Sequence, residues 1–124
     1  MTLSTTETFR RYLAQLPLIA ILRGLAPREA PRVAQTLIQA GFRIIEVPLN
    51  SPHPVESIRR MASELGDQAL FGAGTVTDPR SVTEIQQAGG KVIVSPHLDL
   101  GIVGATKENN LVSIPGVATP SEAY

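Results

Sequence analysis

The residue with the clearest capacity for chemistry is Glu46, a carboxylate inside the aliphatic run of residues 44–47. In an extended strand alternate side chains share a face, so Glu46 is expected beside Ile44 and Pro48. Aliphatic neighbours should partly desolvate the carboxylate and raise its pKa, which suits proton transfer near neutral pH. Arg23, at the end of another apolar run, can meet Glu46 or an anionic substrate if both face inward. A structural ion pair is the alternative interpretation.

A second candidate is the turn Gly72-Ala73-Gly74-Thr75, where glycine lets a ligand approach the backbone and threonine offers a hydroxyl. The third glycine of a dinucleotide fingerprint is missing, and a plain tight turn explains the segment about as well. His53 is expected on the surface, and His97 at the rim of the site, where a lone histidine is more often structural. Patterns of zinc proteases, serine hydrolases and P-loop enzymes are absent from the sequence.

The elements that must position these residues alternate regularly. Five short apolar runs predict strands that begin near residues 18, 43, 69, 91 and 111. Amphipathic stretches between them predict helices, and a further helix is expected over Thr5–Gln15 before the first strand. This βα repeat is typical of a parallel sheet covered on both faces.

Turn chemistry marks the boundaries of the helices. Three dipeptides predict helix starts, with proline at the first helical position: Ala26-Pro27, Ser51-Pro52 and Asp78-Pro79. Three glycines predict helix ends: Gly41, Gly66 and Gly89. Because ligands of such folds bind at the carboxyl ends of the strands, the candidate residues should gather at one rim. The repeat allows either part of a barrel or a complete five-stranded doubly wound module.

Composition narrows the function classes. The 124 residues are 43% hydrophobic and carry a formal net charge of zero, so a core is expected but no basic field for nucleic acid or anionic lipid. The absence of cysteine excludes disulfides and thiolate chemistry. The apolar run Leu18–Leu22 is too short to cross a membrane, and the first residues lack the apolar core of a signal peptide. We expect one cytoplasmic domain over residues 1–124.

Five motifs, in order, give the sequence a family resemblance. The motifs are Ile21–Gly24, Ile45–Pro52, Gly72–Val76, Ile93–Pro96 and Ile114–Ala123. With them the sequence closely resembles the 2-keto-3-deoxy-6-phosphonate aldolases. The segment Pro48-Leu49-Asn50-Ser51 is similar to the phosphogalactonate branch of that family, where the phosphogluconate branch has Thr-Leu-Arg-Thr.

The resemblance implies a (β/α)8 TIM barrel, usually trimeric, that needs neither metal nor cofactor. Such an enzyme splits a keto-acid sugar phosphate into pyruvate and glyceraldehyde 3-phosphate through a lysine Schiff base. Carried over by motif, Glu46 would transfer protons. Arg23 and Thr75 would hold the carboxylate on the pyruvate side, and Asn50 and Pro96 would line the site.

The lysines depart from this pattern. The family places its Schiff-base lysine on the sixth strand, whereas Lys91 precedes the fourth run and Lys107 lies near the end of a predicted helix. Thr119–Glu122 reads as a capped helix start, and the sequence stops at Tyr124. The expectation is therefore a barrel truncated after about five strands and inactive alone. The alternative is a non-catalytic half-barrel that binds a keto acid or a partner fragment.

Overall fold

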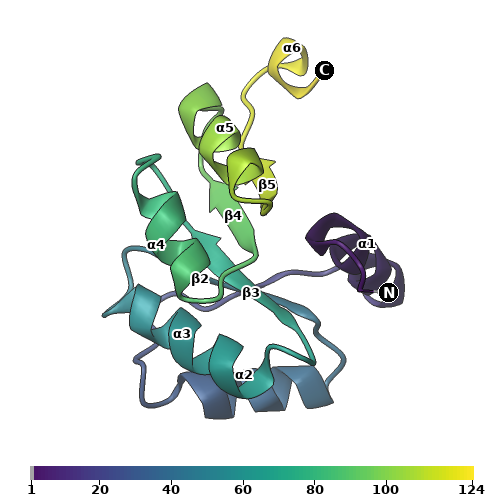
Figure 1. The fold of residues 1–124 in the computed structure, drawn as a ribbon, viewed down its shortest axis with the longest axis vertical. Helices are drawn as coiled ribbons and strands as arrows, with labels where there is room; N and C mark the ends of the chain where they lie inside the picture. The colour runs from purple at the N-terminus through teal and green to yellow at the C-terminus, as the bar shows by residue number, and fades with distance from the viewer. Residues whose placement is uncertain (1) are drawn as a thin grey trace.

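The computed structural model describes residues 2–124, in which helices and strands alternate along the chain (Figure 1). The strands are β1 (Ala20–Ile21), β2 (Ile44–Pro48), β3 (Leu70–Gly74), β4 (Val92–Ser95) and β5 (Val112–Pro115). The helices are α1 (Thr5–Gln15), α2 (Ala30–Gln39), α3 (Pro54–Leu65), α4 (Ser81–Gln87), α5 (Leu100–Glu108) and α6 (Pro120–Ala123).

The five strands form one parallel sheet in the order β1-β2-β3-β4-β5. Each strand therefore lies beside its neighbour in sequence, and the sheet has no point at which the strand order reverses. A doubly wound module requires such a switch point. The order thus rejects the doubly wound alternative and agrees with the expected segment of a barrel.

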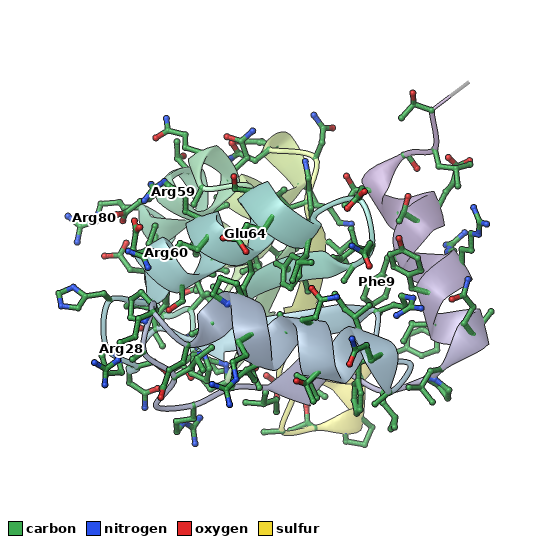
Figure 2. All side chains as sticks on the ribbon, turned by 90° about the horizontal axis from the view of Figure 1, so that it is seen from below. Phe9, Arg28, Arg59, Arg60, Glu64 and Arg80 are labelled. Carbon is green, nitrogen blue, oxygen red and sulfur yellow. The ribbon has the colours of Figure 1, made fainter. Side chains whose placement is uncertain are left out.

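The two faces of the sheet are covered by different helices. Helices α2 to α5 form a layer on one face, while α1 lies apart from them (Figure 1). The helix-layer side encloses the larger core, to which the sheet contributes Ile45, Val47, Phe71, Ala73 and Ile93. The opposite face, here called the α1 face, carries Ile44, Leu70, Val92 and Val112, which pack with Phe9, Tyr12 and Leu13 of α1. Phe9 points from α1 toward the sheet (Figure 2).

Helix α1 has the predicted bounds, and local chemistry explains its start. The Ser4 hydroxyl accepts a hydrogen bond from the Glu7 backbone N–H at 3.2 Å, and the Ser4 N–H donates to the Glu7 carboxylate at 2.8 Å. This reciprocal pair satisfies two amides that the first helical turn leaves without partners. The Thr119 side chain caps α6 by accepting a hydrogen bond from the Glu122 N–H at 3.2 Å.

The starts of three other helices were predicted two or three residues too early. Helices α2, α3 and α4 begin at Ala30, Pro54 and Ser81. The residues predicted to cap them form turns or other contacts; Asp78, for example, accepts from the Arg80 N–H at 2.9 Å. An Asp-Pro or Ser-Pro pair favours a turn as readily as a helix start, because both satisfy the same amides.

The predicted helix ends are confirmed. Gly41 and Gly89 directly follow the C-cap residues of α2 and α4 and have φ angles of 108° and 95°, and Gly66 is the C-cap of α3. The first strand is shorter than predicted, since only Ala20 and Ile21 of the run 18–22 pair with β2.

Among the described residues, strands β1 and β5 are the edges of the sheet, and each pairs on one side only. Ile21 on β1 is 62% exposed, so apolar surface remains open beside that edge. No helix within residues 2–124 has the length and apolar character needed to cross a membrane.

Candidate active site

Glu46 lies near the carboxyl end of β2, on the α1 face, and only 3% of it is exposed. Its Oε2 atom is buried and has no hydrogen-bond partner within residues 2–124. Burial raises the pKa of this carboxyl from 4.5 to about 7, because it disfavours the charged form, while the nearby Arg23 guanidinium partly opposes that rise. The prediction of a desolvated carboxylate influenced by Arg23 is confirmed.

Gly74, at the end of β3, provides the space that the carboxylate occupies. The register pairs Glu46 with Gly72 and Pro48 with Gly74, so the two strands lie side by side here. A Cβ atom at Gly74 would overlap the Glu46 carboxylate. The sequence predicted that glycine would let a ligand approach this backbone, and the group that approaches it is the protein's own carboxylate.

Thr75, the next residue, is half-buried and has a φ angle of 54°. A β-branched residue in this left-handed region is a genuine outlier and costs of order 1–3 kcal/mol. Such strain is concentrated at functional sites, where the surrounding structure holds it in place. The turn after β3 is therefore a constrained feature beside Glu46.

The other predicted site residues lie at the same edge of the sheet. Arg23 follows β1 and is exposed, yet it is close enough to Glu46 to influence its pKa. Asn50 is exposed in the turn after β2, and Pro96 is exposed directly after β4. The structure thus brings together Arg23, Glu46 and the turn containing Thr75, whereas no hydrogen bond within residues 2–124 joins Asn50 to Glu46.

Ser51 is a buried residue of this edge that the sequence analysis assigned to a helix start. Its hydroxyl instead accepts a hydrogen bond from the Gly24 N–H at 3.0 Å, which links the ends of β1 and β2. The sequence held no signal for this contact, because a serine before proline is also an ordinary helix cap.

The two lysines lie away from this edge. Lys91 is exposed and directly precedes β4, at its amino end, and Lys107 is exposed in the last turn of α5. His53 and His97 are also exposed, and His97 lies 3.8 Å from Asp99. In the described part of the chain, no three acidic or histidine side chains form a group that could hold a metal ion.

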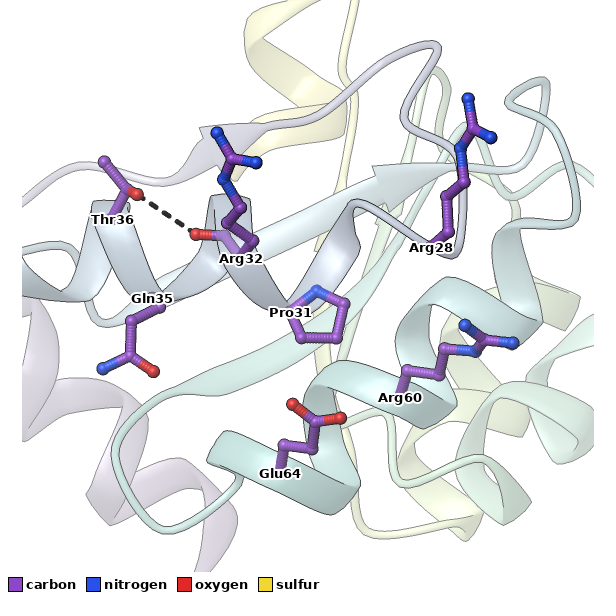
Figure 3. Close-up of a pocket in the computed structure, with 7 residues that line it drawn as sticks. All are labelled: Arg28, Pro31, Arg32, Gln35, Thr36, Arg60 and Glu64. Carbon is purple, nitrogen blue, oxygen red and sulfur yellow. Dashed lines mark hydrogen bonds between the residues drawn. The ribbon is translucent and has the colours of Figure 1, made fainter.

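A separate surface groove lies between α2 and α3 (Figure 3). It is lined by Arg28, Pro31, Arg32, Gln35, Thr36, Arg60 and Glu64. None of these is a predicted site residue, and the groove belongs to the helix layer rather than to the carboxyl edge of the sheet. Arg60 is already paired with Glu56 at 3.1 Å. This groove is therefore not part of the candidate site around Glu46.

Comparison with known proteins agrees with the motifs at this edge. The chain is 44% identical over 107 residues to a probable 2-dehydro-3-deoxy-6-phosphogalactonate aldolase of Rhizobium meliloti, covering 86% of this chain and 50% of the relative. It is 40% identical over 114 residues to the 2-dehydro-3-deoxy-6-phosphogalactonate aldolase of Escherichia coli, covering 92% of this chain and 56% of the relative. The chain thus spans about half the length of these curated relatives.

Solved structures give the same result for the fold. A native KDPGal structure superposes with a TM-score of 0.85 at 41% identity, over 88% of this chain and 53% of that one. A KDPG aldolase from Legionella pneumophila, with pyruvate captured as a covalent carbinolamine, superposes with a TM-score of 0.81 at 28% identity. The match covers 90% of this chain and 54% of that one. The βα units of this chain correspond to about half of a TIM-barrel aldolase. Since the model of the KDPG and KHG aldolases also matches residues 10–124, this chain belongs to the KDPG and KHG aldolase family.

Proposed function

We propose that this chain supplies the N-terminal half of a class I aldolase site that cleaves 2-dehydro-3-deoxy-6-phosphogalactonate to pyruvate and glyceraldehyde 3-phosphate. The observation that carries the proposal is Glu46, a buried carboxyl at the carboxyl edge of the sheet with a pKa of about 7 and an oxygen that has no hydrogen-bond partner within residues 2–124. The galactonate branch is supported by the residues 48–51 and by the relatives at 44% and 40% identity.

The reaction needs an electron sink beside the bond that breaks. An amine condenses with the keto group, loses water and gives a protonated imine. Glu46 then removes the proton of the substrate hydroxyl, the carbon–carbon bond breaks to release the aldehyde, and the bonding electrons pass to the imine as an enamine. Glu46 returns the proton to the enamine carbon, and water releases pyruvate. A carboxyl that titrates near pH 7 can both accept and donate this proton.

The other residues have supporting roles in this proposal. The exposed Arg23 guanidinium would bind the carboxylate of the keto acid, together with the hydroxyl of Thr75. Asn50 and Pro96 would line the same edge. Neither Lys91 nor Lys107 is placed to form the imine, so the amine must come from the part of a full-length aldolase that lies beyond this match. We therefore expect this chain alone to be inactive.

Borohydride trapping with pyruvate tests the proposal. The chain alone should give no covalent adduct by mass spectrometry. Co-expressed with the C-terminal segment of the Escherichia coli relative, it should form a complex in which the adduct appears on the partner segment's lysine. Samples without pyruvate are the control. An adduct on Lys91 or Lys107 would overturn the inactivity of the chain, and a stable complex without adduct or cleavage would overturn the aldolase assignment.

A second candidate function is a non-catalytic half-barrel that binds a keto acid or a partner fragment. The unpaired edges of β1 and β5 and the exposed Ile21 favour it, because unpaired edges pair readily with other strands. Pyruvate binding by the complex without turnover would support this candidate over the aldolase. Family resemblance further suggests a trimer of the complete barrel, which light scattering on the complex can test.

A further inference from the structure

The turn that carries Arg23 is attached to β2 at two points, one on each side of the arginine. Before it, the Leu22 N–H donates to the Glu46 carbonyl oxygen at 2.9 Å. After it, the Gly24 N–H donates to the Ser51 hydroxyl at 3.0 Å. Both anchors belong to the segment that contains Glu46 and the turn after it.

This attachment matters because β1 is a weak support by itself. The strand consists of two residues and pairs with β2 alone, since it is an edge of the sheet. Beyond the Leu22 bond, the ladder between the two strands has ended. The hydroxyl of Ser51 is therefore the contact that continues the link between the two chain segments, across 27 positions of sequence.

Ser51 is itself held firmly. It is 7% exposed, and its backbone N–H donates to the Pro48 carbonyl oxygen at 3.0 Å, which closes a turn on the end of β2. A buried hydroxyl with a fixed backbone can hold a partner segment with little freedom of its own.

We propose that Ser51 is a positioning residue, whose hydroxyl fixes the Arg23–Gly24 turn and so keeps the Arg23 guanidinium beside Glu46. Through Arg23 it would set where the carboxylate of the keto acid binds; that part rests on the proposed function. Supporting groups of this kind hold the residues that contact substrate in their working geometry. The sequence motif around Ser51 gives it no such role, since serine before proline predicts a helix cap.

The effect on Glu46 tests this role, because Arg23 is the charged group that lowers the pKa of Glu46. The titration of Glu46 is followed by NMR of the labelled carboxyl carbon in the full chain. Arg23→Gln should raise the pKa of Glu46, since the positive charge is lost. Ser51→Ala should raise it in the same direction, and the double variant should show no further rise over Arg23→Gln.

Ser57→Ala is the matched control. Ser57 is also a buried serine, on α3, and its hydroxyl has no partner within the described residues, so this variant should leave the Glu46 titration unchanged. If Ser51→Ala does not fold, Ser51→Cys keeps nearly the same volume with a weaker acceptor and should show the same direction. Hydrogen exchange of the Gly24 amide should be faster in either variant.

Two outcomes would overturn the proposal. An unchanged pKa of Glu46 in a folded Ser51 variant would mean that the hydroxyl only stabilises the turn. If Ser51→Ala raises the pKa of Glu46 further in a protein that already carries Arg23→Gln, then Ser51 acts on Glu46 by a route other than Arg23. The titration needs neither substrate nor lysine, so its result is independent of the borohydride experiment that tests the aldolase assignment.

Discussion

The burial of Glu46 predicts a specific dependence of stability on pH. In the unfolded chain this carboxyl titrates near its ordinary pKa of 4.5, whereas in the folded chain burial raises the pKa to about 7. Between these two values the folded state holds a proton that the unfolded state has released. Its contribution to stability is therefore complete below about pH 4.5 and is lost as the pH rises to about 7.

The size of the effect follows from the difference between the two pKa values. They differ by about 2.5 pH units, and each unit corresponds to about 1.36 kcal/mol, so the folded state loses at most about 3 kcal/mol over this window. Above about pH 7 the contribution should level off. Such a loss is a large fraction of the stability of an ordinary small domain.

Glu46→Gln isolates this contribution, because the amide keeps the shape of the side chain but does not titrate. Urea unfolding of both proteins from about pH 4 to about pH 8 gives the difference in their unfolding free energies. We expect that difference to shift in favour of the glutamine variant by up to about 3 kcal/mol as the pH rises. A difference that is the same at every pH would refute a buried, proton-holding Glu46.

Three further predictions concern positions whose contacts are defined. Gly74→Ala should push the Glu46 carboxylate out of its space and toward water, which returns its pKa toward 4.5 in an NMR titration. Gly104→Ala on α5, whose methyl group would meet nothing within 4 Å, is the control and should leave the pKa of Glu46 near 7. Asp99→Ala should lower the free energy of unfolding, measured in urea, by about 1 kcal/mol, because the Asp99 side chain caps α5. Asp99→Asn keeps a capping oxygen and should retain most of that stability, and an equal loss in both variants would contradict the capping role. Ser4→Ala should cost about 1 kcal/mol by the same measure because it removes the capping box of α1, and an unchanged midpoint would contradict that assignment.

Much of the architecture could be predicted from local sequence. The period of apolar residues predicts the alternation of strands and helices, and α1 has the bounds Thr5–Gln15 that were expected from the sequence. Strand alternation predicts that Glu46 shares a face with Ile44, and in the structure Ile44 packs on the α1 face while Ile45 and Val47 join the core on the other side. Glycines at 41 and 89 end their helices as predicted, because a positive φ is needed there. These features depend on residues a few positions apart.

Other features required the tertiary structure. The same βα repeat permits a barrel segment or a doubly wound module, and only the pairing of the strands in sequential order separates them. The helix starts after Ser51 and Asp78 were misplaced, since the cap-like residues there found other partners. The length of β1 likewise depended on its pairing with β2 rather than on its apolar run.

The candidate site shows the same division. The sequence by itself determined that a carboxylate, an arginine and a glycine-threonine turn would lie at or near the carboxyl ends of three of the strands. Only the tertiary structure decided that Gly74 makes room for Glu46 and that Ser51 holds the turn of Arg23. The physical reason is the distance along the chain over which each effect acts. Strand period and turn chemistry depend on residues a few positions apart. The desolvation of Glu46 and the hydrogen bond between residues 27 positions apart exist only after the sheet has brought distant segments together.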